Sequence, residues 1–165
     1  MAAPVVEVVV EAGAWDAAML TPLAERACAA ALRAAGAPSA VWEVALLATD
    51  DAAMARLNAG FRGRDRATNV LSWPAADLRP ETPGSTPRPP ETDADLHLGD
   101  IALGWETCRA EAIEADRPLA QHLAHLIVHA LLHLLGYDHG TDADATLMEG
   151  LERIALAELG VPDPY

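Results

Sequence analysis

The stretch PLAQHLAHLIVHALLHLLGYDH, from Pro118 to His139, decides the fold of this chain. From Pro118 to Leu135 its residues are apolar on nearly every side of a helix, a pattern typical of a helix buried at the centre of a protein. The strongly polar groups inside this helix are histidines. Strands and other helices must therefore pack around it, and its histidines must find partners in the interior.

Three of the histidines have a spacing that can build a metal site. His129 and His133 are four residues apart, so they project from one face of an α-helix, one turn apart. Gly136 can adopt the left-handed conformation that ends a helix, which lets the chain fold back and bring His139 to the same ion. Three neutral nitrogen ligands suit zinc, and a site with three protein ligands keeps a position for water, as catalytic zinc sites do. We therefore predict one zinc ion (Zn2+) per chain, bound by His129, His133 and His139.

The alternative is that these histidines are ordinary core residues, each hydrogen-bonded to a backbone carbonyl. Burying several imidazoles without partners would cost roughly 1–3 kcal/mol each, whereas one shared cation satisfies them together. This difference favours the metal site. His122 and His125 lie near the same face, but neither has a third partner released by a glycine. We expect them to pack in the core or to orient the ligand imidazoles.

Residue 130 discriminates between two kinds of metal chemistry. The histidine spacing equals that of the metzincin peptidases, HExxHxxGxxH, whose glutamate serves as general base. In this chain that position is Ala130. A methyl group cannot take a proton from water, so the peptidase mechanism loses its main catalyst. Peptide hydrolysis is therefore the second hypothesis.

The stretch from His129 to His139 resembles the motif of the YbeY family of bacterial endoribonucleases, HGxLHLxGYDH, with Ala130 in place of the usual glycine. The resemblance covers most of the chain from about residue 58 onward. It includes RGRDRATNVLSWP (62–74), LGDIAL (98–103), Met148, Glu149 and Glu152.

This resemblance implies a zincin-like α+β fold and a zinc-dependent, single-strand-specific endoribonuclease. It implies a role in ribosomal RNA maturation, at the 3′ end of the small-subunit RNA, and in ribosome quality control. The implied partners are ribosomal RNA, the small ribosomal subunit, a small-subunit ribosomal protein and an Era-type GTPase. A non-catalytic, zinc-containing ribosome assembly factor stays open, because the residues identify no general base. Asp138 is near enough in sequence, but an acid beside a metal-binding histidine more often orients a ligand or caps the turn.

Net charge limits how this chain could bind RNA. The formal net charge is -14, from 25 acidic residues against 11 arginines with no lysine, so long-range attraction to RNA should be weak or repulsive. The stretch from Arg56 to Arg66 is locally positive, because it holds four arginines and a single acid, Asp65. These arginines could bind phosphate, or the stretch could be a solvated loop in which Asp65 pairs with a neighbour. The family resemblance favours the first reading and identifies Arg62 as our predicted catalytic residue.

Length and composition favour a single domain over residues 1–165. At 165 residues the chain should bury roughly 70% of its unfolded surface, enough for a substantial core. Cys28 and Cys108 form no CxxC pair, so we expect buried thiols and neither a disulfide framework nor a cysteine zinc site. The first residues lack a positive leader, and no run is long and apolar enough to span a membrane. We expect a cytoplasmic protein with no membrane partner.

Periodicity and breaker residues predict an α+β fold, a small mixed sheet of about four strands packed against helices with the metal-binding helix at the centre. The predicted strands are 5–10, 41–48, 68–73 and 96–103, and the predicted helices are 21–36, 50–58, 105–115, 118–135 and 141–160. The crossovers after the first two strands are long enough for parallel pairing, while the last two strands could pair either way. Residues 75–95 contain five prolines, so we expect a mobile surface loop there.

Overall fold

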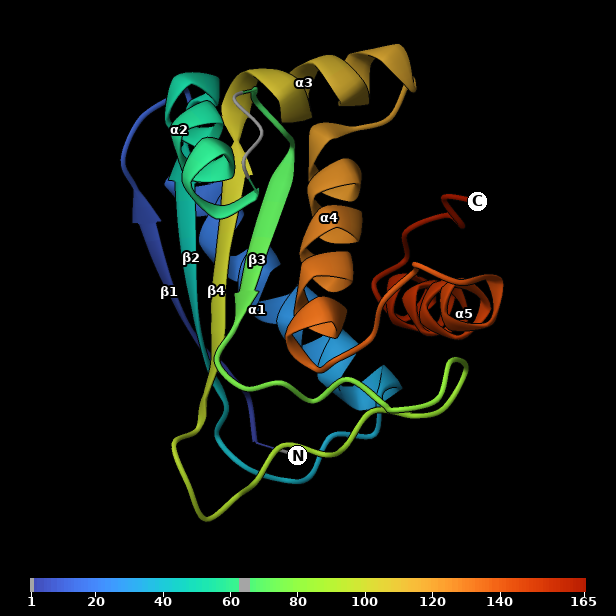
Figure 1. Ribbon diagram of the computed structural model, residues 1–165. Coiled ribbons are helices and arrows are strands. Elements are labelled where there is room, and N and C mark those ends of the chain that lie inside the picture. Colours follow the sequence, from blue (N-terminus) through green and yellow to red (C-terminus); the bar gives the residue numbers. More distant parts are fainter. Residues whose placement is uncertain (1, 63–65) are drawn as a thin grey trace.

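The chain forms one four-stranded sheet with helices on both of its faces (Figure 1). The computed structural model describes residues 2–62 and 66–165, without the side chains of Phe61 and Arg62. Within this range the strands are β1 (Val5–Val10), β2 (Glu43–Thr49), β3 (Val70–Pro74) and β4 (His97–Gly104). The helices are α1 (Ala17–Ala34), α2 (Asp51–Arg62), α3 (Trp105–Glu114), α4 (Leu119–Leu134) and α5 (Asp142–Glu158). The predicted α+β class is confirmed.

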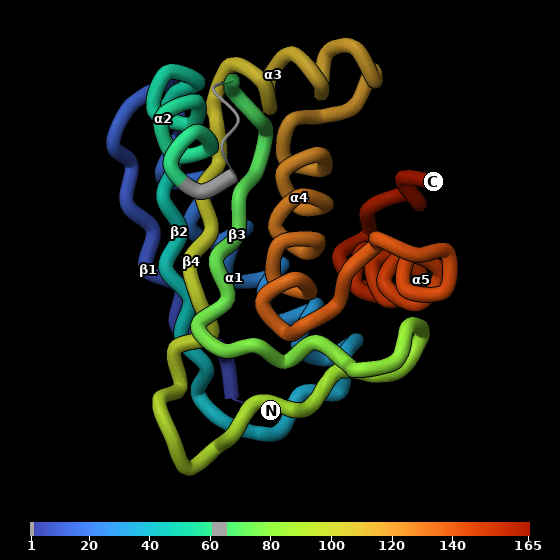
Figure 2. Tube along the Cα trace, viewed as in Figure 1, coloured from blue at the N-terminus to red at the C-terminus, as the bar shows by residue number. Residues whose placement is uncertain are grey.

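The sheet is mixed, with strand order β1-β2-β4-β3. β1 pairs parallel with β2, and β2 pairs parallel with β4, which the long connections between these strands allow. β3 runs antiparallel to β4, with Leu71 opposite Ala102 and Pro74 opposite Gly99, which settles the pairing that the sequence left open. Pro74 is tolerated because it ends an edge strand. Figure 2 shows that β3 is also the strand nearest to α4, and the two elements are in contact.

Alternate residues of the inner strands face two separate cores. On one face, Ile101 and Leu103 of β4 join the main core together with side chains of α1, α4 and α5. On the other face, Ala102 of β4 and Leu71 of β3 pack with Met54 of α2. Successive side chains of a strand point to opposite faces of a sheet. The helix α2 therefore lies across the sheet from α4.

The predicted central buried helix is α4, which lies between the sheet and α5 (Figure 1). It packs against α1, α3, α5, β3 and β4. Leu123, Ile127 and Leu131 are completely inaccessible to solvent. Truncating any one of them to alanine would cost about 2–5 kcal/mol, because the surrounding elements could not close the cavity. No helix in the described chain, α4 included, is both long and apolar enough to cross a membrane.

The helix α1 begins four residues before the predicted start at Thr21. The side chain of Asp16 accepts hydrogen bonds from the backbone N–H groups of Ala18 and Met19. These bonds satisfy two of the donors that the first turn of a helix leaves open. Pro22 then lies inside the helix, where it has no N–H to donate to the carbonyl of Ala18.

The helix α2 continues past the predicted end near Asn58 and ends at Arg62. Gly60 lies within it and is exposed, with no atom within 4 Å of the position that a Cβ would take. A glycine inside a helix costs about 1 kcal/mol relative to alanine. That cost is too small to end a helix that is held on the sheet through Met54.

The segment from 75 to 95 contains no helix or strand and runs past the end of α4 toward α5 (Figure 1). Leu78 is buried, and its carbonyl accepts a hydrogen bond from the N–H of Arg88 at 3.0 Å. The carboxylate of Asp144 on α5 accepts a hydrogen bond from the N–H of Gly84 at 2.7 Å. The segment is thus tied to itself and to α5, and its mobility stays a prediction.

Candidate metal centre

His129 and His133 lie one turn apart on α4, as their spacing predicts. Both side chains are partly buried, and their rings pack edge to face with centroids 4.5 Å apart. The helix places them near its C-terminal end, beside the turn that leads to α5. This end of α4 therefore presents two imidazoles next to the point where the chain changes direction.

The chain changes direction at Gly136, whose φ of +99° lies in the region that favours glycine. The N–H groups of Gly136 and Tyr137 bond to the carbonyls of His133 and Leu132, the pattern that closes the end of many helices. A Cβ at Gly136 would lie only 2.7 Å from the carbonyl carbon of Leu78. Glycine is required here both for its conformation and for the close approach of another backbone.

After this turn, His139 returns to the two helical histidines, as predicted. Its ring centroid lies 5.2 Å from that of His129 and 5.1 Å from that of His133. One nitrogen from each of the three imidazoles lies within 4.8 Å of the other two. Among the described residues, this is the group of side chains that could hold a metal ion. His139 is exposed, so the group opens to solvent on its side.

The second nitrogen of each helical histidine is already engaged in a hydrogen bond. His133 Nδ1 lies 2.9 Å from the carbonyl oxygen of Tyr137, which can only accept, so Nδ1 bears the proton. His129 Nδ1 lies 3.3 Å from a carboxylate oxygen of Glu152. Burial by itself raises the pKa of Glu152, but hydrogen bonds from His125 and His129 outweigh burial and lower that pKa to about 2. An ionised carboxylate also only accepts, so both Nδ1 atoms are donors.

Both Nε2 atoms consequently present lone pairs, and they face each other across 3.0 Å. Two acceptors cannot share a hydrogen bond, so this contact is unfavourable unless a cation lies close to both atoms. Two nitrogen ligands of one tetrahedral zinc ion lie about 3.4 Å apart, since each Zn–N bond is about 2.0–2.1 Å long. The donor set therefore fits a metal ion.

Burial keeps His133 in the neutral form that binds metals. Burial first, and then the neighbouring imidazoles of His129 and His139, lower the pKa of His133 from 6.5 to about 4. At neutral pH this imidazole has no proton to release before it binds a cation. The site is thus ready to accept a metal ion without a change of protonation at His133.

The two other histidines of α4 bond to carboxylates outside the group of three. His122 Nε2 lies 2.9 Å from Glu111 on α3, and His125 Nε2 lies 2.8 Å from Glu152 on α5. Neither joins the metal-binding group. His125 shares the carboxylate of Glu152 with His129, and the two rings also pack edge to face with centroids 6.3 Å apart.

The sequence analysis named Glu152 only as part of the family resemblance and gave it no role at the site, because nothing local assigns it a partner. It is completely buried on α5, on the same side as the completely buried Met148 and Ala155. An acid at a position where helical spacing calls for an apolar side chain is a usable signal, since a buried carboxylate needs donors around it.

Asp138 caps the turn that returns His139, one of the roles expected for an acid at this position. Its carboxylate accepts a hydrogen bond from the backbone N–H of His139 at 2.8 Å. This bond fixes the backbone directly before the third imidazole. The described contacts give Asp138 a structural role and assign it no proton transfer.

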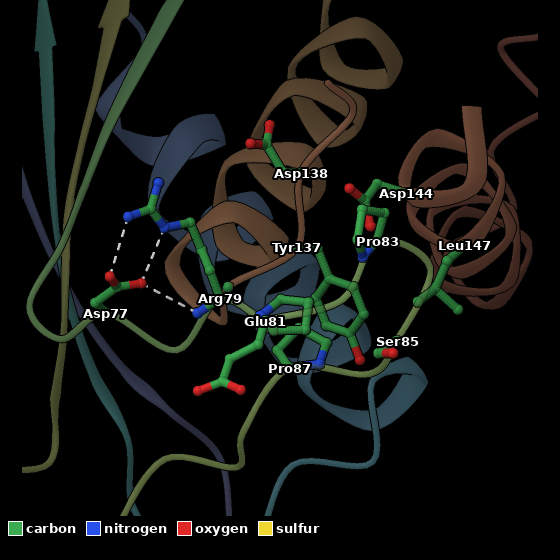
Figure 3. A pocket seen from close by; sticks show the side chains of 12 residues that line it. Asp77, Arg79, Glu81, Pro83, Ser85, Pro87, Tyr137, Asp138, Asp144 and Leu147 are labelled. Atoms are coloured by element: carbon green, nitrogen blue, oxygen red, sulfur yellow. Dashed lines mark hydrogen bonds and ion pairs between the residues drawn. The ribbon is translucent and has the colours of Figure 1, made fainter. Parts of the chain in front are cut away.

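A cleft opens beside His133. It consists of two adjoining hollows of 450 and 390 Å³, which share walls made by residues 77 and 79 and by the turn at 136–138. His133 lines the larger hollow. The smaller hollow reaches Asp144 and Leu147 of α5 (Figure 3). An extended chain lying in the cleft would therefore pass His133 of the metal-binding group.

The described charged side chains that line the cleft are acidic apart from Arg79, beside the partly buried His133. Figure 3 shows Asp77, Glu81, Asp138 and Asp144 around it, with Arg79 bonded to Asp77. The Arg79 guanidinium donates two hydrogen bonds to that carboxylate, at 2.9 and 3.0 Å. The cleft itself therefore offers little net positive charge to a polyanion. A metal ion at the histidines would supply part of the charge that RNA requires.

Arg62, the predicted catalytic residue, is the last residue of α2, and its side chain lies outside the described residues. Residues 63–65, which include Arg64, also lie outside them. Arg56 and Arg66 are described, and both are exposed. Because α2 lies across the sheet from α4, an RNA that touched both Arg62 and the histidines would have to pass around the edge strand β3.

Taken together, the mixed sheet, the buried helix with its three imidazoles and the adjoining cleft define a zincin-like α+β protein with a candidate metal site. Residues 10–160 match the family described as endoribonuclease YbeY. Proteins named Endoribonuclease YbeY are 51% identical over 160 residues in Jannaschia sp. (97% of this chain, 99% of that one) and 55% identical over 149 residues in Ruegeria pomeroyi (89% and 90%). A third, from Dinoroseobacter shibae, is 53% identical over 162 residues (97% and 90%). The chain belongs to the YbeY endoribonuclease family.

A solved structure supports the fold. The solution structure of a Thermotoga maritima protein matches 94% of this chain and 91% of its own chain, with a TM-score of 0.55. The two sequences are 19% identical. At this level of identity the likeness shows a shared fold.

Proposed function

We propose that this chain is a zinc-dependent endoribonuclease whose zinc ligands are His129, His133 and His139. Membership of the YbeY endoribonuclease family makes it a hydrolase of RNA phosphodiester bonds. The observation that supports the metal is the pair of Nε2 lone pairs facing each other across 3.0 Å, with both Nδ1 atoms already acting as donors.

Different residues of the chain would hold the ion and contact the RNA. A zinc ion bound here would polarise a phosphoryl oxygen and lower the pKa of water. His133 is held by the Tyr137 carbonyl and His129 by the Glu152 carboxylate, so both imidazoles are oriented before the ion binds. Arg62 would stabilise the negative charge that develops on the attacked phosphate.

We further propose that the substrate is single-stranded RNA, as the family resemblance implies, and that it lies in the cleft beside His133. The finer assignment is ribosomal RNA at the 3′ end of the small-subunit RNA, reached with a small-subunit ribosomal protein and an Era-type GTPase. The setting would be the cytoplasm. We propose a single domain over residues 1–165, because β1, near the start of the chain, and α5, near its end, both contribute side chains to the same main core.

The geometry gives the peptidase hypothesis little support. Its general base would have to replace Ala130, which is 1% exposed and lies in the main core. A glutamate there would face apolar side chains, away from solvent. Hydrolysis of RNA therefore accounts for the site better than hydrolysis of peptides.

Metal content and cleavage, measured on the same samples, test this proposal. Wild type, His133→Ala and His122→Ala should be purified identically and assayed with a labelled single-stranded RNA, a duplex of the same sequence and an unfolded protein. We expect one zinc ion per chain and cleavage of the single strand by wild type. His133→Ala should lose both zinc and cleavage.

His122→Ala is the matched control, because His122 lies on the same helix but bonds to Glu111. It should keep its zinc and its activity. Full zinc content in His133→Ala would refute the ligand assignment. Cleavage of the unfolded protein but not of RNA would replace the nuclease with a peptidase.

A further inference from the structure

Glu152 forms a completely buried junction between α4, α5 and the last residues of the chain. Its side chain is inaccessible to solvent. It projects from α5 toward α4, and its hydrogen-bond partners come from α4 and from Tyr165. A carboxylate in such a place is stable only if several donors compensate for the loss of water.

Three side chains donate to this carboxylate. His125 Nε2 lies 2.8 Å and His129 Nδ1 lies 3.3 Å from Oε1. The hydroxyl of Tyr165 lies 3.0 Å from each of the two oxygens. Both oxygens therefore have partners, and the group is a charged acceptor with a fixed orientation.

Tyr165 is itself held by several contacts. Its ring packs edge to face on His125, with centroids 5.6 Å apart, and the guanidinium of Arg153 lies 5.3 Å from its centroid. The backbone N–H of Tyr165 donates to Asp163, which also accepts a hydrogen bond from Arg153. These contacts fix the hydroxyl over Glu152.

The carboxylate of Glu152 determines the tautomer and the ring orientation of His129. A histidine that binds a metal through Nε2 must have its proton on Nδ1, and an acceptor at Nδ1 selects that tautomer and fixes the ring. For His133 this acceptor is a backbone carbonyl, which substitution of side chains leaves in place. For His129 the acceptor is the side chain of Glu152. One half of the helical ligand pair thus depends on a residue 23 positions further along the chain.

We propose that Glu152 is a positioning residue for the metal centre, which holds His129 in the Nδ1–H tautomer with Nε2 directed at the ion, while His125 and Tyr165 hold Glu152. This inference rests on the proposed function, because it assumes that His129 binds zinc. It assigns to α5 and the C-terminal segment a part in metal binding, although neither contributes a ligand.

The test compares the zinc affinity of wild type, Glu152→Gln and Glu158→Gln by competition with a chromogenic chelator. Glu158→Gln is the matched control, since it makes the same charge change on the same helix at an exposed pair with Arg33. Loss of a group that orients a metal-binding histidine weakens affinity by roughly 10–100-fold, and we expect a loss of that size for Glu152→Gln and none for Glu158→Gln. Unfolding midpoints of the zinc-free proteins show whether each variant is folded under the assay conditions.

A second measurement uses the wild-type protein, so it does not depend on how a variant folds. Long-range 1H–15N correlations of the zinc-free protein near pH 7.5 report which ring nitrogen of His129 bears the proton. The Nδ1–H tautomer is expected. An Nε2–H tautomer would overturn the proposal even if Glu152→Gln did not fold.

The outcomes separate this inference from the function on which it rests. Wild type that binds no zinc overturns the proposed function, and the inference with it. Wild type that binds zinc, with equal affinity in Glu152→Gln, overturns the inference alone. A variant that is less stable but binds zinc as tightly as wild type would reduce Glu152 to a purely structural residue.

Discussion

We predict that Gly136→Ala destabilises this protein much more than Gly36→Ala, although the two glycines end helices in the same way. Gly36 follows α1 and Gly136 follows α4, with φ values of +65° and +99°. At each, the glycine N–H and the next N–H bond back to the last turn of the helix. Their surroundings differ. A Cβ at Gly36 would meet nothing within 4 Å, whereas one at Gly136 would lie 2.7 and 2.8 Å from backbone atoms of Leu78.

The expected loss of unfolding free energy has two parts, the cost of the left-handed conformation and the cost of the clash with Leu78. The left-handed conformation costs an alanine about 1–2 kcal/mol, so Gly36→Ala should lose about that much. Gly136→Ala adds a clash with backbone that cannot rotate away, and overpacking of this kind costs about 1–3 kcal/mol more. At this chain length 1 kcal/mol corresponds to roughly 2–4 °C in melting temperature. We therefore expect a loss of a few degrees for Gly36→Ala and roughly two to three times as much for Gly136→Ala.

Urea denaturation of chelator-treated proteins, followed by tryptophan fluorescence, measures the difference. The metal must be removed because ligand binding to the folded state adds its own stabilisation. Gly136→Ala should also weaken zinc binding, since the residue after Gly136 supplies the carbonyl that holds His133. If the two variants lost the same free energy of unfolding, within about 0.5 kcal/mol, the close approach of Leu78 would not matter and the reasoning would be refuted.

Two further predictions concern pH and RNA. The pKa of His133 is about 4 in the folded protein against 6.5 unfolded, so its stabilisation is complete above pH 6.5 and is lost as the pH falls toward 4. Chelator-treated wild type should lose about 2 kcal/mol between pH 7 and pH 5 that His133→Gln does not lose, and identical pH dependence in the two proteins would contradict this. Arg62→Glu should abolish RNA cleavage while zinc content stays at one per chain, whereas Arg26→Glu, at an exposed position of α1 outside the arginine-rich stretch, should keep both. Undiminished cleavage by Arg62→Glu would remove Arg62 from the mechanism.

The central helix and its histidines could be predicted because their determinants are local. The apolar periodicity of α4, the four-residue spacing of His129 and His133, and the glycine after the last turn all act within a few residues of one another. The errors at the ends of two helices had one local and one tertiary cause. The cap at Asp16 moved the start of α1, and the packing of Met54 outweighed the preference of Gly60 for a helix end.

The sequence by itself determined the buried helix and the three imidazoles that can meet at one ion, and it allowed parallel pairing of the first strands. Only the tertiary structure decided that β3 runs antiparallel at the edge, that Leu78 presses against Gly136, and that Glu152 reaches His129. The physical reason is separation along the chain. A helix and its turns are fixed by neighbours within about one turn, but Glu152 and His129 meet because α5 folds back across α4. That path depends on the summed packing of the whole core, and no short pattern of residues encodes it.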